Sequence, residues 1–119
     1  MTVGENDQRW DVQLGKSVDK DLRRFRLVMG ELLRKLAVLE RNPDAGEELT
    51  GNRRGARSLK FSLKGTGECR AAYVKLPDNR ICLLFLVGPR ENFYREAARR
   101  FDALQRRDNL GVDDNPSTL

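Results

Sequence analysis

At 119 residues, the chain has the length of one domain with a modest core, and 39% hydrophobic against 34% charged residues is typical of a globular protein. Its apolar run at residues 81–87 is too short to cross a bilayer, and the polar N-terminal sequence lacks the pattern of a signal peptide. We therefore expect one cytoplasmic domain of residues 9–107, with disordered tails at 1–8 and 108–119.

The basic residues are concentrated in the body of the chain. The net charge is +5, from 23 Lys and Arg against 18 Asp and Glu, but five of the acids lie before Arg9 or after Arg107. The body therefore holds 23 basic and 13 acidic residues, a charge of +10, and 17 of the 23 are arginines. Arginine suits bidentate contacts with phosphate. Two interpretations follow, a solvated basic surface or the binding of a polyanion such as nucleic acid.

The N-terminal part predicts a strand and then a helical segment. Residues 10–14 (WDVQL) alternate between apolar and polar, which indicates a short strand, and Ser17 can cap the helix that follows. One apolar helix face then recurs at spacings of three and four: Val18, Leu22, Phe25, Met29, Leu32, Leu36 and Leu39. The segment ends before Pro43 and fits either one long helix or a hairpin of two, with Gly30 as the weak point. Its three heptads favour an intramolecular core face over a coiled-coil dimer.

The middle of the chain predicts a polar loop and then a strand. Residues 43–57 (PDAGEELTGNRRGAR) are rich in turn formers, and we expect the loop there to carry Arg53, Arg54 and Arg57. Residues 58–63 (SLKFSL) alternate, which predicts a strand with one face in the core and the other exposed. The core face holds Leu59, Phe61 and Leu63, and the exposed face holds Ser58, Lys60 and Ser62.

Two further strands and a helix complete the predicted domain. A turn at 64–67 (KGTG) leads to a strand at 70–76, and a turn at 77–79 leads to residues 80–87, whose apolar run is typical of a central strand buried on both faces. Asn92 can cap the last helix, with Arg95, Arg99 and Arg106 on one face. Its core stripe is Phe93, Ala97, Phe101 and Leu104. We therefore expect an α+β domain, with helices packed on an antiparallel sheet of about four strands.

The residue inventory excludes most kinds of catalytic site. The chain has no histidine, and Cys69 and Cys82 match no zinc spacing, so we expect both to be buried thiols. Carboxylates are scattered singly, and the glycine motifs of phosphate loops and nucleophile elbows do not occur. We therefore expect no metal and no cofactor. The candidates that remain are four cations and one ring: Lys60, Arg70, Arg80, Arg90 and Tyr94.

Several motifs, taken in order, resemble those of the RelE/ParE superfamily, the toxins of bacterial type II toxin–antitoxin systems. They are residues 49–51 (LTG), 58–60 (SLK), 69–73 (CRAAY) and 84–100 (LFLVGPRENFYREAARR), the last similar to the family's VG-x-R…Y…A ending. The resemblance covers residues 10–104 and implies the RelE-like fold. It also implies one of two activities. RelE-like members are metal-independent ribonucleases that cut messenger RNA in the ribosomal A site, whereas ParE-like members poison DNA gyrase.

The resemblance implies a set of site residues. The ribonuclease branch uses a lysine, two arginines and a tyrosine, which by position correspond to Lys60, Arg70, Arg90 and Tyr94. RelE has a second lysine where this chain has Ser62, and Lys64 can substitute from the hairpin. Together with the positive charge, the resemblance also implies RNA contacts from Arg53, Arg54, Arg57, Lys64, Arg95 and Arg99.

Metal-free cleavage of RNA requires three tasks of such residues. The 2′-hydroxyl must lose a proton, charge on phosphorus must be stabilised, and the leaving 5′ oxygen must be neutralised or protonated. Lys60 can accept the proton if neighbouring cations lower its pKa, and Arg70 would clamp the phosphate. Arg90 would bind the phosphate near a helix N-terminus and help at the leaving oxygen, while Tyr94 would stack on or orient a base.

Each of these residues also has a purely structural interpretation. Lys60 can be a solvated strand residue, Arg70 an ion-pair partner of Asp78 or Glu68, and Tyr94 a packing residue at a helix start. Their joint occurrence favours a ribosome-dependent mRNA endonuclease that arrests translation, with the ribosome aligning its substrate. The alternatives are a gyrase inhibitor without a reaction of its own, or a degenerate module that binds only RNA or antitoxin. The resemblance also implies a cognate antitoxin that folds on binding.

Overall fold

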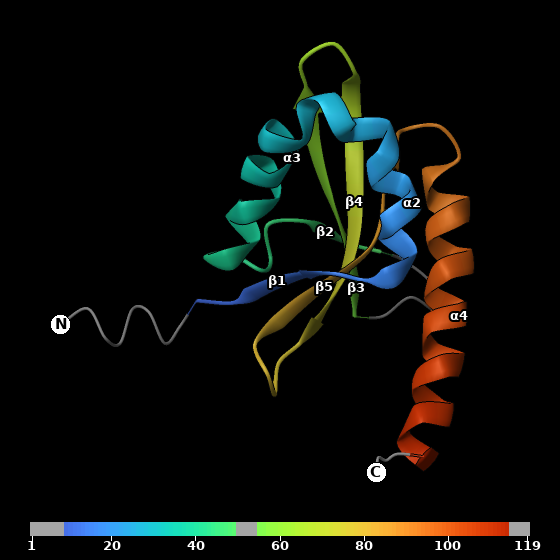
Figure 1. Cartoon of the computed structure of the whole chain (residues 1–119). Coiled ribbons are helices and arrows are strands. Elements are labelled where there is room, and N and C mark those ends of the chain that lie inside the picture. Colours follow the sequence, from blue (N-terminus) through green and yellow to red (C-terminus); the bar gives the residue numbers. More distant parts are fainter. Residues whose placement is uncertain (1–8, 50–54, 115–119) are drawn as a thin grey trace, which may run out of the picture.

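The computed structural model describes residues 9–49 and 55–114, which form an α+β fold as predicted (Figure 1). The first half contains β1 (Asp11–Leu14), the 3-10 turn η1 (Lys16–Val18), α2 (Asp19–Leu22), η2 (Arg23–Val28), α3 (Met29–Leu36) and η3 (Ala37–Glu40). The second half contains β2 (Glu47–Glu48), β3 (Ala56–Leu63), β4 (Gly67–Leu76), β5 (Ile81–Pro89) and α4 (Phe93–Asp114). In this part of the chain, no helix has the length and apolar character needed to span a membrane.

The sheet has five strands in the order β1-β5-β4-β3-β2. Its three long strands are antiparallel neighbours, as the alternation and the two turns predict. The expected all-antiparallel sheet of about four strands is corrected at both edges. β1 pairs parallel with β5, and the two-residue β2 pairs with β3. A pairing between distant segments leaves no local sequence signal, and two residues are too few to show a period.

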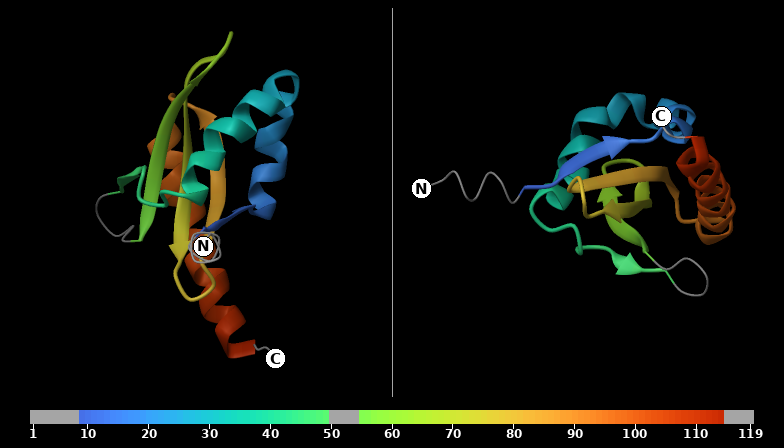
Figure 2. Two further views of the ribbon diagram at one scale, coloured as in Figure 1. Left: turned by 90° about the vertical axis from the view of Figure 1, so that its left-hand side faces the viewer. Right: turned by 90° about the horizontal axis from the view of Figure 1, so that it is seen from below.

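The helical segment takes the hairpin alternative. Two arms around α2 and α3 meet at η2 and fold back on one another (Figures 1 and 2). The helical dihedrals are broken at Val28, with φ −121° and ψ 25°, two residues before the predicted weak point at Gly30. The predicted apolar face lies inside the molecule, with Val18, Phe25, Leu32, Leu36 and Leu39 at most 2% exposed. The prediction of an intramolecular core face is therefore confirmed.

The sheet has a hydrophobic cluster on each face. The helical segment packs on Leu59, Phe61 and Leu63 of β3, as predicted. The opposite face packs against the stripe of α4 formed by Phe93, Ala97, Phe101 and the partly buried Leu104. Ser58 was expected to face outward but is only 5% exposed. It lies on the same face of β3 as Ala56, two residues before it, which belongs to the α4 cluster, so this end of the face is covered by protein.

The segment before β3 is fixed by a buried tyrosine. The Tyr73 hydroxyl donates to the Pro43 carbonyl at 2.7 Å and accepts from the Gly46 N–H at 3.0 Å. A Cβ at Gly46 would come within 2.7 Å of the Ser58 carbonyl oxygen, so the close approach requires glycine. Arg57, expected in the loop, is part of β3, which begins at Ala56. The pairing with β4 extends the strand into the predicted loop.

Helix α4 begins after Asn92, as expected, and the Asn92 carbonyl accepts the Glu96 N–H at 3.1 Å. Asn92 itself is left-handed, with φ +57°, a conformation that asparagine adopts more readily than most residues. The helix backbone continues to Asp114, past the expected end at Arg107, because an established helix extends without a core. Residues 1–8 and 115–119 of the predicted tails lie outside the described residues.

Both cysteines are free thiols buried in the sheet, as predicted. Burial raises the pKa of Cys82 to about 11 and also raises that of Cys69. Neither sulfur is therefore suited to act as a nucleophile at neutral pH.

Candidate functional site

The β3–β4 hairpin places two of the predicted site residues opposite each other. Lys60 and Arg70 are partners in the register of the two strands, and Arg70 is also opposite Gly88 of β5. Directly paired residues have Cβ atoms about 4.5–5.5 Å apart, so the two side chains share one face of the sheet. Lys60 is exposed, whereas the side chain of Arg70 is only 13% exposed. Like charges directly opposite one another are destabilising, and a bound anion would relieve their repulsion.

Helix α4 adds Tyr94 to this pair. The Arg70 Nη1 donates to the Tyr94 hydroxyl at 2.8 Å, and the guanidinium carbon lies 5.3 Å from the centre of the ring. The neighbouring Phe93 is buried and meets the Tyr94 ring edge to face, which fixes the start of the helix. Tyr94 is 51% exposed. A large aromatic side chain is therefore presented to solvent beside a cation, an arrangement suited to stacking on a base.

An acidic residue completes the contacts of Arg70. The Arg70 Nη2 lies 2.6 Å from Oε2 of Glu68, which is the second of the two ion-pair partners that the sequence suggested. The Nε atom is buried and has no hydrogen-bond partner among the described residues. Arg70 is therefore held on two sides, by Glu68 and by Tyr94, while one of its donors stays unsatisfied. Its two contacts come from its own strand and from α4, so the site depends on how α4 is seated.

Arg90 lies apart from this contact set. It follows the end of β5, is exposed, and borders a shallow hollow of about 550 Å³ together with Glu68, Pro89 and Glu91. Among the described residues, no hydrogen bond joins Arg90 to Arg70 or Tyr94. The structure thus brings Lys60, Arg70 and Tyr94 together, and Arg90 is linked to them through the hollow that it lines together with Glu68. We call these four residues and Glu68 the Arg70 site.

The additional residues predicted to contact RNA are divided by the structure. Arg57 donates from Nε to the Gly46 carbonyl at 2.9 Å, which holds the segment before β2, and its side chain is partly exposed. Lys64 lies in the exposed β3–β4 turn, and its backbone N–H donates to the Glu31 carboxylate at 3.2 Å. Arg95 and Arg99 are exposed on α4. Arg53 and Arg54 lie outside the described residues.

The described part of the chain has no group of three His, Cys, Asp or Glu side chains that could hold a metal.

A family model of the ParE-like toxin of type II bacterial toxin–antitoxin systems matches residues 13–98. The chain belongs to this family. The match includes the hairpin that carries Lys60 and Arg70 and the start of α4 with Tyr94. No curated protein matches the toxin's sequence.

Solved structures share the fold of the toxin. The toxin–antitoxin complex RelBE2 from Mycobacterium tuberculosis is 20% identical, with a TM-score of 0.56 over 69% of this chain and 99% of that one. A double arginine mutant of the E. coli toxin RelE in the free state is 23% identical, with a TM-score of 0.60 over 77% and 97%. The isolated E. coli RelE toxin is 22% identical, with a TM-score of 0.53 over 76% and 97%. At these identities the likeness is one of fold.

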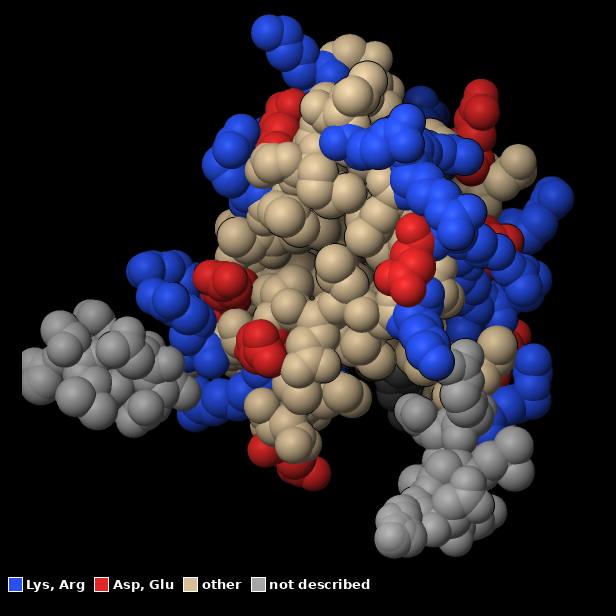
Figure 3. Space-filling view, viewed as in Figure 1, with Lys and Arg blue, Asp and Glu red and all other residues tan. Residues whose placement is uncertain are grey.

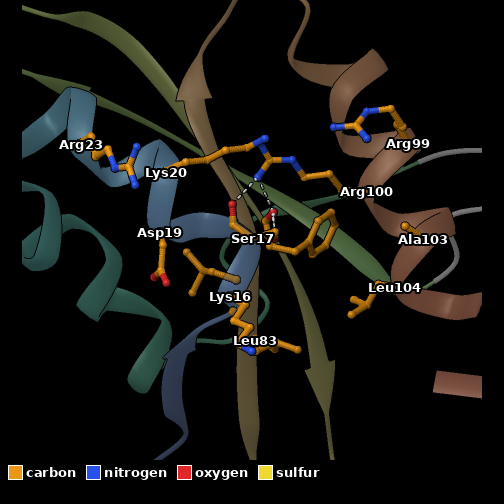
Figure 4. Close-up of a pocket in the computed structure, with 13 residues that line it drawn as sticks. Lys16, Ser17, Asp19, Lys20, Arg23, Leu83, Arg99, Arg100, Ala103 and Leu104 are labelled. Carbon is orange, nitrogen blue, oxygen red and sulfur yellow. Dashed lines mark hydrogen bonds between the residues drawn. The ribbon is translucent and has the colours of Figure 1, made fainter. Parts of the chain in front are cut away.

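A second cavity of the toxin, of about 460 Å³, lies between the start of the helical segment and α4 (Figure 4). Lys16, Lys20, Arg23 and Arg99 border it, and it shares no residue with the Arg70 site. Arg100 reaches across it from α4 and donates to the carbonyls of Ser17 and Phe85, both at 3.0 Å (Figure 4). Arg100 also forms a buried ion pair with Asp21 at 2.8 Å. This arginine therefore fastens α4 to α2 and to the edge of β5.

The basic residues of the helical segment form a band on the surface of the toxin. On the face seen in Figure 3, Lys and Arg side chains gather along the α2 side, and the middle of the face is largely uncharged. Exposed cations of this segment include Lys16, Lys20, Arg23, Arg24 and Arg26 in and beside α2, and Arg34 and Lys35 on α3. Part of the positive charge predicted for the body is thus gathered along the α2 side of this face (Figure 3).

Proposed function

We propose that the toxin is a ribosome-dependent mRNA endonuclease that cleaves by attack of the 2′-hydroxyl on the adjacent phosphate, without a metal. The observation that carries this proposal is the Arg70 guanidinium, which contacts the exposed ring of Tyr94 and lies opposite Lys60. A cation that can clamp phosphate is thereby placed beside a ring that can stack on a base. These are the two recognition elements that a single-stranded RNA needs.

The four predicted residues have separate tasks in this proposal. Arg70 binds the non-bridging oxygens of the scissile phosphate, and Tyr94 stacks on an adjacent base. Arg90, on the far side of the hollow, holds the next part of the backbone, and Lys60 adds positive charge from β3. The exposed Arg95, Arg99 and Lys64 guide the RNA toward this face.

Alignment by the ribosome is part of the proposal. The Arg70 site is open and shallow, so it cannot enclose a flexible RNA and hold it in line for attack. Well-oriented reactants gain roughly 7–11 kcal/mol over free ones, and a messenger fixed in the A site is such a reactant. We therefore expect weak cleavage of naked RNA and strong cleavage of translated RNA.

A cognate antitoxin is the second partner of the proposal. One of the solved structures with this fold is a toxin–antitoxin complex. The described body carries a band of exposed cations along α2, which fits an acidic segment that folds as it binds. The toxin would act on cytoplasmic ribosomes once this partner is lost.

Inhibition of DNA gyrase is the second candidate function. The observation that favours it is the family match, which is to ParE-like toxins. Such a toxin would act by occupancy, and the Arg70 site would have no reaction to perform. Loss of supercoiling activity in purified gyrase, with intact messenger, would support this candidate.

Primer extension on an mRNA under translation in a purified system tests the first proposal. We expect cuts within codons for the wild type, none without ribosomes, and a decrease of about 10²–10³-fold for Arg70→Ala, because one preorganised charge on the phosphate is lost. Arg106→Ala removes an exposed arginine of α4 outside the site and serves as the control. Growth arrest without any cut, or equal cleavage of naked RNA, would contradict the proposal.

A further inference from the structure

We infer that Glu68 accepts the proton of the attacking 2′-hydroxyl, and that Lys60 donates the proton that the leaving 5′ oxygen requires. This inference rests on the proposed ribonuclease function and assigns its acid and base. It gives the one carboxylate of the Arg70 site a catalytic task in place of a merely structural one.

The position of Glu68 is the first argument. Glu68 is the cross-strand partner of Ser62 and lies diagonal to Lys60, which pairs with Arg70. It also borders the same hollow as Arg90. A ribose-phosphate unit bound between Arg70 and Arg90 would therefore have the Glu68 carboxylate at its side. Its side chain is 35% exposed, so the carboxylate is accessible from the hollow.

The chemistry of the residue types is the second argument. An ionised carboxylate has only acceptor sites, whereas an ammonium group has only donors. Lys60 would have to lose a proton before it could accept one, although it lies opposite a second cation and is exposed. Glu68 needs no such step. Glu68 can therefore act as the base and Lys60 as the acid without either residue changing its charge before the reaction starts.

The contacts of Arg70 supply the third argument. Arg70 binds Glu68 through Nη2 at 2.6 Å and the Tyr94 hydroxyl through Nη1 at 2.8 Å. A phosphate offers the planar fork of arginine two oxygens at once. An incoming phosphate therefore competes with Glu68 for Arg70, and the carboxylate is released next to the 2′-hydroxyl when the substrate is seated.

The proposed step balances in atoms and charge. The proton of the 2′-hydroxyl moves to a Glu68 oxygen, and the 2′ oxygen forms a bond to phosphorus while the bond from phosphorus to the 5′ oxygen breaks. The 5′ oxygen takes a proton from the Lys60 ammonium. The products are a 2′,3′-cyclic phosphate and a 5′-hydroxyl, after which Glu68 gives its proton to water and Lys60 regains one.

Single-turnover cleavage of A-site mRNA on purified ribosomes, measured from acidic to neutral pH, tests this assignment. Glu68→Gln keeps an oxygen that can accept from Arg70 but removes the proton acceptor, so a residue that only positions Arg70 would tolerate it. We expect a loss of about 10²–10⁴-fold, as for other general bases, and loss of the acid limb of the rate–pH profile. Glu68→Asp should keep that limb. Glu47→Gln, an exposed glutamate on β2, is the matched control.

The charged groups around Glu68 could also shape the profile. They are Arg70 on its own strand, Lys60 diagonal to it on β3, and Arg90 and Glu91 across the hollow. Chemical rescue separates their influence from that of a base. Formate added to Glu68→Ala should restore cleavage by at least about tenfold, in proportion to the concentration of formate anion. Rescue also demonstrates that the variant is folded.

Two failures are distinguishable. If the wild type cuts translated mRNA and Glu68→Gln cuts it nearly as fast with the same acid limb, or formate gives no rescue, Glu68 is not the base and the ribonuclease function stands. If the wild type cuts no translated mRNA, the proposed function is overturned and the role of Glu68 with it.

Discussion

Two arginines of the toxin, Arg100 and Arg70, contrast in how their donors are used. Arg100 is 9% exposed and makes five hydrogen bonds, two of them to Asp21 and one to Glu96. Arg70 has two partners, Glu68 and Tyr94, and its Nε has none among the described residues. Both residues link a strand to α4. Only Arg100 is satisfied by the protein alone.

The contrast shows how one residue type serves stability and function in a chain with 17 arginines. A buried charge requires partners for all its donors, and Arg100 has carboxylates and carbonyls on every side. Its contacts fasten α4 about two turns after Phe93 and Tyr94 begin the helix. Arg70 uses that fixed helix end as a support. Arg70, whose Nη atoms are held by Glu68 and Tyr94 among the described residues, is the arginine that can exchange a carboxylate partner for phosphate.

The largest expected difference between the two arginines is in the free energy of unfolding that is lost when each guanidinium is removed. Arg100→Met should lower the free energy of unfolding by about 3–5 kcal/mol, because Asp21 and two carbonyls lose a buried partner. Arg70→Met should lower it by about 1 kcal/mol or less, because Glu68 is solvated once freed. Urea titrations followed by circular dichroism give both values. Equal losses would contradict the division into a structural and a functional arginine.

The aromatic partner of Arg70 gives the next largest effect. Tyr94→Ala should reduce cleavage on the ribosome by a factor that corresponds to about 1–3 kcal/mol, the value of stacking one base on a ring. Tyr94→Phe keeps the ring and removes only the hydroxyl that accepts from Arg70 at 2.8 Å, so it should retain most of the rate. Neither change should weaken folding much, because Tyr94 is half exposed. If Phe and Ala reduce the rate equally, the hydroxyl rather than the ring carries the function.

The sequence predicted most of the core, and of the two arginines compared it predicted the role of Arg70 but not that of Arg100. The alternation in residues 58–63 and the helical spacing from Val18 to Leu39 identified most of the buried positions. Buried apolar residues recur about once per helical turn and at every second position of a strand, so the sequence shows their period. Lys60, Arg70 and Tyr94 could be grouped through the resemblance, since its motifs lie on neighbouring strands and a helix start. To group these three residues, it was enough to know that the two strands are neighbours and that the last helix starts nearby.

Arg100 was missed although a signal for it exists. It lies three residues after Ala97 and one before Phe101, which places it on the core stripe of α4. An arginine in that position predicts a buried ion pair, but the partner, Asp21, is 79 residues away in the sequence. The parallel pairing of β1 with β5 likewise joins segments about 70 residues apart. Local periodicity carries no information on these.

The smallest expected effect concerns acid stability on the Arg100 side. Hydrogen bonds from Arg99 and Arg100 hold the pKa of Glu96 at about 2, below its ordinary 4.5. The folded state therefore favours the carboxylate. The stability that this provides is present above about pH 4.5 and is lost as the pH falls toward 2. Because Glu96 is 32% exposed, solvent reduces the contribution to about 1 kcal/mol.

Glu96→Gln measures this contribution directly. The difference in unfolding free energy between wild type and variant should be about 1 kcal/mol at pH 6 and approach zero near pH 2. Glu31→Gln, whose carboxylate binds only the backbone of the β3–β4 turn among the contacts described, provides a control for general acid effects. A difference that stays constant with pH would mean that Glu96 acts through packing. In that case the charge of Arg100 would be balanced by Asp21 alone, and the role of Arg100 would be to hold α4 against α2.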